Sequence, residues 1–163
     1  MSVVIRQVGP SDEPFLWRML ATTAGLPPAV PPPVEAVQAN PGMSHYLVGW
    51  RRPGDAGVVA EMDRNPVGAA WFRFFSASSP GYGFVAEDIP EISLGVEAGW
   101  RSRGIGRALL QALIERARDD GHSSLSLSVD ARNAQALALY RSLGFETVGG
   151  DAGNPTMLLR LLG

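Results

Sequence analysis

The stretch of residues 91–129 constrains the fold more than any other part of the chain. Residues 91–96 alternate, with aliphatic side chains on one side only, as expected for a strand with two different faces. Residues 104–120 place apolar side chains at helical spacing, and Gly121 stands where a glycine commonly follows a helix. Residues 124–129 then alternate again. This order predicts two parallel strands joined by a right-handed helical crossover.

The rest of the chain predicts further strands and helices around this unit. We expect strands at residues 3–8, 57–62, 67–75, 145–148 and 157–162, and helices at residues 11–25, 34–40 and 134–143. Gly25 is expected to end the first helix and Pro41-Gly42 the second, and residues 63–66 have turn chemistry. Residues 46–50 fit a strand or a helix end equally well.

Length and element order together predict the fold class. The chain has 163 residues, which is typical of one domain. The consecutive strands before and after the crossover are expected to be antiparallel. We therefore expect an α/β (α+β) fold, with one domain over residues 1–163 built on a mixed, mostly antiparallel sheet. Helices flank this sheet, and a parallel β-α-β unit lies at its centre.

Composition excludes several classes of function. The formal net charge is -2, which argues against nucleic-acid binding through a broad basic surface. There is no cysteine and there are only two histidines. Disulfides, thiolate zinc sites and a cysteine nucleophile are thereby excluded, and no metal site is expected. The sequence has no run of 18 apolar residues and no recognisable signal peptide, which predicts a cytoplasmic protein without a membrane partner.

Residues 101–107, with the sequence Arg-Ser-Arg-Gly-Ile-Gly-Arg, predict chemistry more directly than any other segment. They lie between a strand and a helix start, where the first backbone N–H groups lack helical partners and the helix dipole is positive. Gly104 and Gly106 allow a phosphate to approach the backbone closely, and three arginines add positive charge suited to phosphate oxygens. The segment therefore predicts an anion-binding loop.

Two common phosphate-binding motifs do not fit this loop. A P-loop needs Lys-Ser/Thr after its last glycine, whereas Gly106 is followed by Arg107 and Ala108. A dinucleotide-binding fingerprint needs a third glycine, and Leu109 stands at that position. A tight turn without a ligand is disfavoured, because three arginines within seven residues would repel one another.

The same stretch resembles a known family. The run Arg101-Ser102-Arg103-Gly104-Ile105-Gly106 is similar to the Arg/Gln-x-x-Gly-x-Gly/Ala motif of the GCN5-related N-acetyltransferases (GNATs). Further residues match that family in type and order, namely Asn133, Ala136, Leu139-Tyr140 and Gly144-Phe145. The resemblance is strong over residues 91–145 and extends to the rest of the chain as element order. It implies the acyl-CoA N-acyltransferase fold.

The resemblance also implies acetyl-CoA as co-substrate and a set of residues that bind it. Leu94, Gly95 and Val96 match the strand whose backbone pairs with the pantetheine arm, and Gly95 has no side chain to obstruct this pairing. Asn133 matches an asparagine that contacts the cofactor, although it equally fits a plain helix N-cap. The residues that match the pyrophosphate-binding loop are Arg101, Ser102, Arg103, Gly104, Ile105, Gly106 and Arg107.

A general acid follows from the resemblance, whereas the general base needs a separate argument. Tyr140 matches the tyrosine that often protonates the departing thiolate, although it also fits a core position between helix and sheet. Some relatives carry a glutamate where this chain has Ser128, which cannot act as a base. Glu91 opens the strand expected to hold the thioester and is the preferred substitute, with a solvated strand-end carboxylate as the alternative. Glu97 and Glu87 are weaker candidates.

We therefore expect an acetyl-CoA-dependent N-acetyltransferase in which a primary amine attacks the thioester directly in a ternary complex. The alternatives are a non-catalytic acyl-CoA-binding or sensing domain and, more weakly, a nucleotide-binding module. The acceptor amine is not specified, although residues 25–43 and 76–90 are expected to shape its pocket. Arg73 lies within an apolar run and either meets an acidic substrate group or points to solvent. Dimers are common in the family, so a homodimer is also considered.

Overall fold

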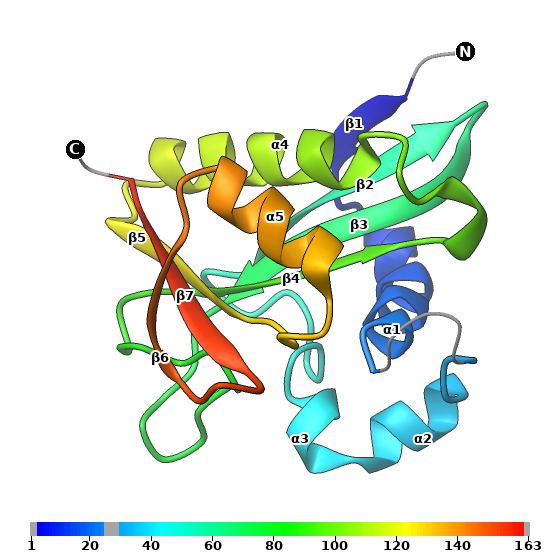
Figure 1. Cartoon of the computed structure of the whole chain (residues 1–163). Helices are drawn as coiled ribbons and strands as arrows, with labels where there is room; N and C mark the ends of the chain where they lie inside the picture. The colour runs from blue at the N-terminus through cyan, green and yellow to red at the C-terminus, as the bar shows by residue number, and fades with distance from the viewer. Residues whose placement is uncertain (1–2, 25–29, 162–163) are drawn as a thin grey trace. The chain divides into compact units, whose positions relative to one another are not determined.

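The computed structural model describes residues 3–24 and 30–161. The chain divides into two compact units: unit 1 comprises Met1–Phe72 and Ser93–Leu113, and unit 2 comprises Arg73–Ile92 and Ile114–Gly163. The α-helices and strands, labelled in Figure 1, are β1 (Val4–Gln7), α1 (Glu13–Thr22), α2 (Val34–Ala39), α3 (Pro41–Ser44), β2 (Ala56–Met62), β3 (Asn65–Arg73), β4 (Glu91–Val96), α4 (Ile105–Asp119), β5 (Ser124–Ser128), α5 (Ala134–Ser142), β6 (Glu146–Gly150) and β7 (Pro155–Arg160). Two short 3-10 turns, η1 (Pro10–Asp12) and η2 (Ala98–Trp100), precede α1 and α4.

The strands form a seven-stranded sheet in the order β1-β2-β3-β4-β5-β7-β6. The pairs β1/β2, β2/β3, β5/β7 and β6/β7 are antiparallel. β4 and β5 are parallel, with Glu91 in register with Ser126, as predicted for the two strands that α4 joins. The mixed, mostly antiparallel sheet and its parallel β-α-β unit are therefore confirmed. The single-domain organisation stays a prediction.

The hairpin of β2 and β3 in unit 1 turns more tightly than the sequence indicated. Met62 pairs with Asn65, so Asp63 and Arg64 alone make the turn, with φ values of 51° and 68°. Positive φ at both central residues is typical of a type I′ hairpin turn. Pro66 therefore belongs to β3 and not to the turn, and the register shifts beside its partner Glu61. Such an irregularity accommodates a residue that has no N–H to donate.

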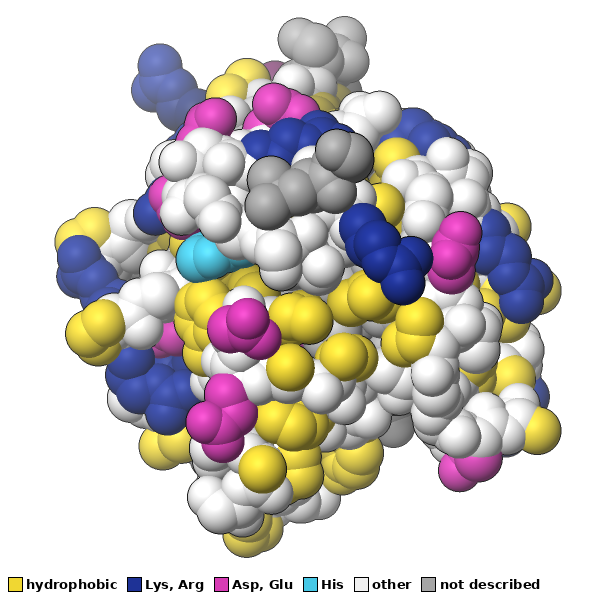
Figure 2. All heavy atoms as spheres, turned by 90° about the vertical axis from the view of Figure 1, so that its left-hand side faces the viewer, with side chains coloured by type: hydrophobic (Ala, Val, Ile, Leu, Met, Phe, Trp, Pro, Cys, Tyr) yellow, Lys and Arg dark blue, Asp and Glu magenta, His cyan; other side chains and the backbone are white. Residues whose placement is uncertain are grey.

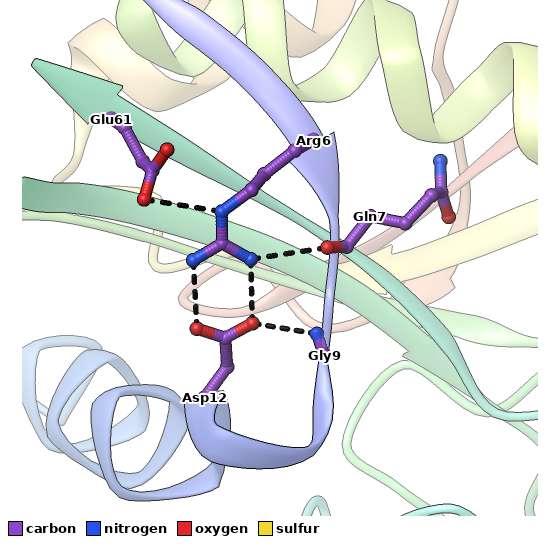
Figure 3. A network of polar contacts seen from close by, with 5 residues as sticks. All are labelled: Arg6, Gln7, Gly9, Asp12 and Glu61. Atoms are coloured by element: carbon purple, nitrogen blue, oxygen red, sulfur yellow. Dashed lines mark hydrogen bonds and ion pairs between the residues drawn. The ribbon is translucent and has the colours of Figure 1, made fainter. Parts of the chain in front are cut away.

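The first helical segment of unit 1 begins with the 3-10 turn η1 and continues as α1, where the sequence predicted one helix from residue 11. Asp12 lies at the junction and accepts a hydrogen bond from the Gly9 N–H at 2.6 Å. Its carboxylate also makes a two-pronged contact with the Arg6 guanidinium, at 2.7 and 2.9 Å, and Arg6 reaches Glu61 on β2 as well (Figure 3). This network ties β1, β2 and α1 together. Gly25, predicted to end the helix, lies outside the described residues.

Two short helices follow where the sequence predicted one. α2 is the expected helix, but Pro41-Gly42 does not simply stop it, because α3 begins at Pro41. The Asn40 side chain accepts a hydrogen bond from Gly42 N–H at 2.9 Å, and proline is well suited to a first helical position. Residues 46–49, which fitted a strand or a helix end, form turns after α3. Residues 26–33, a stretch with five prolines that reads from the sequence as a stiff surface connector, lie partly outside the described residues.

Unit 2 is built on β5 and β7. Leu125, Leu127 and Met157 are at most 1% exposed, and Leu127 pairs with Met157. In β6, by contrast, every residue is exposed, so this strand is held by its pairing with β7. On the face that Figure 2 shows, where β5, β6 and β7 lie in Figure 1, hydrophobic side chains gather beside acidic ones. Within the two described stretches, no helix has the length and apolar character needed to cross a bilayer.

Candidate active site

The predicted anion-binding loop lies in unit 1, between β4 and α4. The Glu97 N–H donates to the Val67 carbonyl at 2.8 Å, which fixes the end of β4 against β3. The chain then forms η2 and adopts positive φ at Ser102 (64°) and Gly104 (79°). Successive backbone N–H groups in a turn of this kind can form a concavity that binds anions. The predicted loop therefore has a backbone that suits an anion.

The start of α4 adds N–H groups to this loop. The first helical hydrogen bond runs from Ala108 N–H to the Gly104 carbonyl at 3.1 Å. The N–H groups of Ile105 and Gly106 precede that bond and have no acceptor within the helix. A side chain at Gly104 would meet nothing within 4 Å, so its positive φ, and not crowding, is what favours glycine there. Ile105 is 4% exposed, so its side chain anchors the loop in the core and only its backbone is suited to bind.

Arg101 and Arg103 of the loop make different contacts within the protein. Arg101 donates through Nε to the Val96 carbonyl at 3.2 Å, so it braces the end of β4. The Arg103 guanidinium lies over the Trp100 ring, 4.9 Å from its centroid. Arg107, in the first turn of α4, is exposed. The three cations therefore have different surroundings, which the sequence did not distinguish.

The sequence suggested that Gly95 leaves room for the pantetheine arm, whereas the structure shows that Gly95 leaves room for α1. A Cβ at this position would lie 2.7 Å from the Met19 carbonyl oxygen and 2.9 Å from Thr22 Oγ1. The space beside Gly95 is therefore used for close packing of α1 on β4. Leu94 and Val96 are half-buried neighbours on the same strand. The expected pairing of their backbone with pantetheine stays a prediction.

Two further residues of unit 1 position this strand and loop, and sequence reasoning missed both of them in that role. Gly68 on β3 faces Leu109, where a Cβ would lie 3.1 Å from Leu109 Cδ1 and 3.2 Å from the Gly95 carbonyl oxygen. Arg18 on α1 forms an ion pair with Glu97. Glu97 was a weaker candidate base, and this ion pair gives its carboxylate a structural partner.

Tyr140 on α5 and Asn133, which precedes this helix, both lie in unit 2. Tyr140 is 8% exposed and makes an edge-to-face contact with Phe145, with centroids 5.8 Å apart. Burial raises the pKa of the Tyr140 hydroxyl to about 12. The phenol therefore holds its proton at neutral pH, as a general acid must. Asn133 caps α5 by accepting from Ala136 N–H at 3.1 Å, so its structural role is observed and its cofactor contact stays a prediction.

Glu91 and Arg73, also in unit 2, are both buried. Glu91 is 3% exposed and Arg73 is fully buried. The alternatives of a solvated strand-end carboxylate and a solvent-facing arginine are therefore wrong. A charged group is buried only at a considerable cost unless other groups compensate it, which makes both positions stand out from ordinary strand residues.

The remaining base candidate has a structural contact of its own. Glu87 accepts a hydrogen bond from the Ala77 N–H at 2.9 Å, which ties together the loop before β4.

Among residues 3–24 and 30–161, no three histidine, aspartate or glutamate side chains come together in a way that would hold a metal ion. The candidate groups are thus the loop and residues 94–96 in unit 1, and Glu91, Asn133 and Tyr140 in unit 2.

Parts of the chain are similar in sequence to curated acetyltransferases. Over 61 residues the chain is 41% identical to the ribosomal protein bS18-alanine N-acetyltransferase of Escherichia coli, which covers 37% of this chain and 41% of that enzyme. Over 92 residues it is 35% identical to the mycothiol acetyltransferase of Thermobifida fusca, which covers 55% of this chain and 28% of that enzyme. The chain thus spans less than half the length of these curated relatives.

Solved structures share the fold over nearly the whole chain. The ribosomal-protein-alanine N-acetyltransferase of Brucella melitensis has a TM-score of 0.70 at 29% identity, covering 96% of this chain and 99% of that one. A GNAT superfamily phosphinothricin acetyltransferase of Sinorhizobium meliloti, solved in complex with acetyl-CoA, has a TM-score of 0.69 at 21% identity, covering 98% and 89%.

The model of the acetyltransferase (GNAT) family matches residues 21–145 of this chain. This range takes in β4, the predicted anion-binding loop, α4, β5 and α5. The resemblance read from the sequence is therefore confirmed, and the chain belongs to the GNAT family of acetyltransferases.

Proposed function

We propose that the protein is an N-acetyltransferase that moves an acetyl group from acetyl-CoA to a primary amine. The observation that carries this proposal is the loop of unit 1, in which Ser102 and Gly104 have positive φ directly before α4. A diphosphate fits such a backbone, because N–H groups and a helix N-terminus converge on it. Acetyl-CoA supplies this diphosphate together with the thioester whose acetyl group is transferred.

Binding is assigned to residues of the loop, the strand before it and the start of α5. The backbone of Leu94, Gly95 and Val96 is proposed to hold the pantetheine arm, and Asn133 to contact the cofactor as well as cap α5. The proposed pyrophosphate ligands are Arg101, Ser102, Arg103, Gly104, Ile105, Gly106 and Arg107. The contacts of Arg101 with Val96 and of Arg103 with Trp100 support this assignment, because they restrict both guanidinium groups before any ligand binds.

Two buried side chains of unit 2 are proposed to move protons. Tyr140 gives its phenolic proton to the departing thiolate, since a phenol, whose ordinary pKa is about 10, holds this proton at neutral pH. Glu91 accepts the proton of the attacking amine, directly or through water. Its 3% exposure suits a carboxylate that is shielded from bulk solvent. The chain has no cysteine, so the amine is proposed to attack the thioester without an acyl-enzyme intermediate.

A non-catalytic acyl-CoA-binding domain is the second candidate. It is favoured by Ser128, which replaces the glutamate of some relatives, and by the structural contacts that Glu87 and Glu97 make. Both candidates share the loop and differ only in turnover.

Calorimetric titration with acetyl-CoA tests the shared part. We expect saturable binding at submillimolar ligand and much weaker binding of ADP. No binding by folded protein would refute both candidates, and ADP binding as tightly as acetyl-CoA would indicate a nucleotide module instead. Release of free CoA in the presence of a panel of primary amines then separates the two, because only the enzyme turns over.

The acceptor of the acetyl group, the cellular location of the protein and its oligomeric state are proposed only in general terms. One relative is named as the alanine N-acetyltransferase of ribosomal protein bS18, and another as a mycothiol acetyltransferase. A protein N-terminus and a small amine are therefore both proposed acceptors. A cytoplasmic location and a homodimer are proposed from the sequence alone. Sedimentation equilibrium measures the oligomeric state.

A further inference from the structure

The loop between β3 and β4 presents one aromatic side chain in an unusual setting. Tyr82 is 64% exposed, while its neighbours Gly81 and Gly83 are both buried. The Phe84 N–H donates to the Gly81 carbonyl at 3.2 Å, which closes a turn with Tyr82 and Gly83 at its corners. The backbone on both sides of Tyr82 is thus packed against protein, while the side chain of Tyr82 is largely exposed.

Gly83 packs this turn directly on β5. A Cβ at Gly83 would lie 2.4 Å from the Leu127 carbonyl carbon, and 2.6 Å from both the Leu127 oxygen and the Ser128 nitrogen. No side chain fits at such distances, so the contact is between one backbone and another. Gly83 does not have a positive φ, and its glycine is therefore required by space and not by conformation. The position of Tyr82 is consequently set by the sheet and not by the loop alone.

The place where the turn packs is next to the proposed base. Ser126 on β5 is in register with Glu91 on β4, and its N–H donates to the Pro90 carbonyl at 3.1 Å. Leu127, which Gly83 contacts, is the next residue along β5. Neighbouring strands are roughly 4.8 Å apart and consecutive residues rise by roughly 3.3 Å. Gly83 therefore lies within about two such steps of the strand position that carries Glu91.

The chemistry of the loop favours a cation borne on an apolar group. Residues 74–90 include no lysine or arginine, and Arg73, which precedes them, is fully buried and not exposed beside Tyr82. Glu87 and Asp88, by contrast, are both acidic and exposed. An aromatic face attracts an ammonium group and also packs against hydrocarbon. A carboxylate on the acceptor would be repelled by the two acidic side chains.

We propose that Tyr82 is a specificity-determining residue that contacts the acceptor, and that the acceptor is a primary amine on an apolar or aromatic group without a carboxylate beside it. The inference rests on the proposed function, since it places the acceptor next to Glu91. It deepens that function by assigning a recognition residue and a chemical class.

Fluorine NMR tests the contact directly, because the chain has only three tyrosines. Tyr46 and Tyr140 are 6% and 8% exposed, so they serve as buried references for Tyr82. Protein labelled with 3-fluorotyrosine is assigned with the variants Tyr46→Phe, Tyr82→Phe and Tyr140→Phe. We titrate the CoA-saturated protein with 2-phenylethylamine and, as a matched probe that adds only a carboxylate, with phenylalanine.

We expect 2-phenylethylamine to shift the Tyr82 signal in a saturable way and phenylalanine to leave it unchanged at the same concentrations. If CoA shifts the Tyr140 signal but neither amine moves Tyr82, the inference is wrong and the proposed function survives. An equal response to both amines overturns the acceptor class. If CoA itself does not bind, the proposed function fails and the inference falls with it.

Steady-state kinetics provides the second measurement. Tyr82→Ala is expected to raise KM for 2-phenylethylamine about tenfold and leave KM for acetyl-CoA unchanged, and Tyr82→Phe is expected to restore most of the loss. Val85→Ala is the matched control, because Val85 is a neighbouring exposed residue of the same loop. Equal acceptor KM values in Tyr82→Ala and Val85→Ala would overturn the role of Tyr82.

Discussion

Unit 1 and unit 2 contribute candidate functional groups of different kinds. In unit 1 the groups are backbone amides, arranged by positive φ at Ser102 and Gly104. In unit 2 they are side chains, Tyr140 and Glu91, whose properties follow from burial. The conformation of a short loop depends mainly on its own residues, whereas burial depends on everything that packs around a position. Unit 1 is therefore best probed by changing conformation, and unit 2 by changing chemistry.

The largest expected effect lies in unit 2. Tyr140→Phe removes the proposed acid and keeps the ring that packs on Phe145, so kcat should fall by roughly 10²–10⁴-fold. The Kd of acetyl-CoA should stay the same, because the loop of unit 1 is unaltered. Stopped-assay turnover and calorimetry measure the two quantities. Unchanged kcat in a folded variant would leave Tyr140 as a core residue only.

The next effect concerns the stability of unit 1. Asp12→Asn removes the charge that Arg6 and the Gly9 N–H contact, and should lower the free energy of unfolding by about 1.5 kcal/mol, the lower end for bonds to charged groups because Arg6 is partly exposed. The matched variant in unit 2 is Asp130→Asn, whose partner Arg132 is largely exposed. We expect a smaller loss there. Equal losses, measured by urea unfolding, would contradict this contrast.

The same carboxylate predicts how unit 1 responds to acid. The hydrogen bonds from Arg6 hold the pKa of Asp12 below its usual value of 3.8. A group whose pKa is lowered by folding stabilises the protein above its unfolded pKa, and this contribution is lost as pH falls through the folded pKa. Wild type should therefore lose more stability than Asp12→Asn below about pH 3.8. Parallel pH dependences of the two proteins would show that Asp12 is not the group responsible.

Two glycine-to-alanine substitutions test, respectively, the packing in unit 2 and the backbone conformation in unit 1. Gly83→Ala places a Cβ against the Leu127 backbone and should cost about 1–3 kcal/mol of stability. Gly104→Ala meets no atom within 4 Å but forces alanine to positive φ, at a cost of about 1–2 kcal/mol. The two variants should differ in function, since only Gly104→Ala is expected to weaken acetyl-CoA binding. Weakened binding in Gly83→Ala alone would reverse the assignment of the two units.

The smallest effect is expected at Ser102. Ser102→Gly removes left-handed strain but adds freedom to the unfolded chain, so the two contributions largely cancel and stability should rise by about 0.5 kcal/mol. Acetyl-CoA affinity should be retained, because the backbone conformation is the one that glycine favours. Thermal unfolding with and without acetyl-CoA measures both. A large loss of affinity would assign the binding role to the Ser102 hydroxyl instead of the backbone.

Much of the fold could be predicted from local patterns. The strand at residues 91–96, the helix after Gly104 and the parallel crossover follow from alternation and helical spacing, because each element must bury its own apolar side. Boundaries were less predictable at the β2–β3 turn, where Pro66 reads as a turn residue but lies in β3 beside a register shift. α3 was missed, since the side chain of Asn40 decides whether Pro41 ends one helix or begins another.

The sequence by itself determined that a loop rich in glycine and arginine precedes a helix, since these residues and their spacing control the backbone at short range, and it predicts that this loop binds an anion. Only the tertiary structure decided that Gly95 serves the packing of α1, that Glu91 and Arg73 are buried, and that Gly83 holds the turn of Tyr82 on β5. These properties arise from segments far apart along the chain. No local pattern records them, because the atoms that exclude water or a side chain at one position belong to residues elsewhere in the sequence.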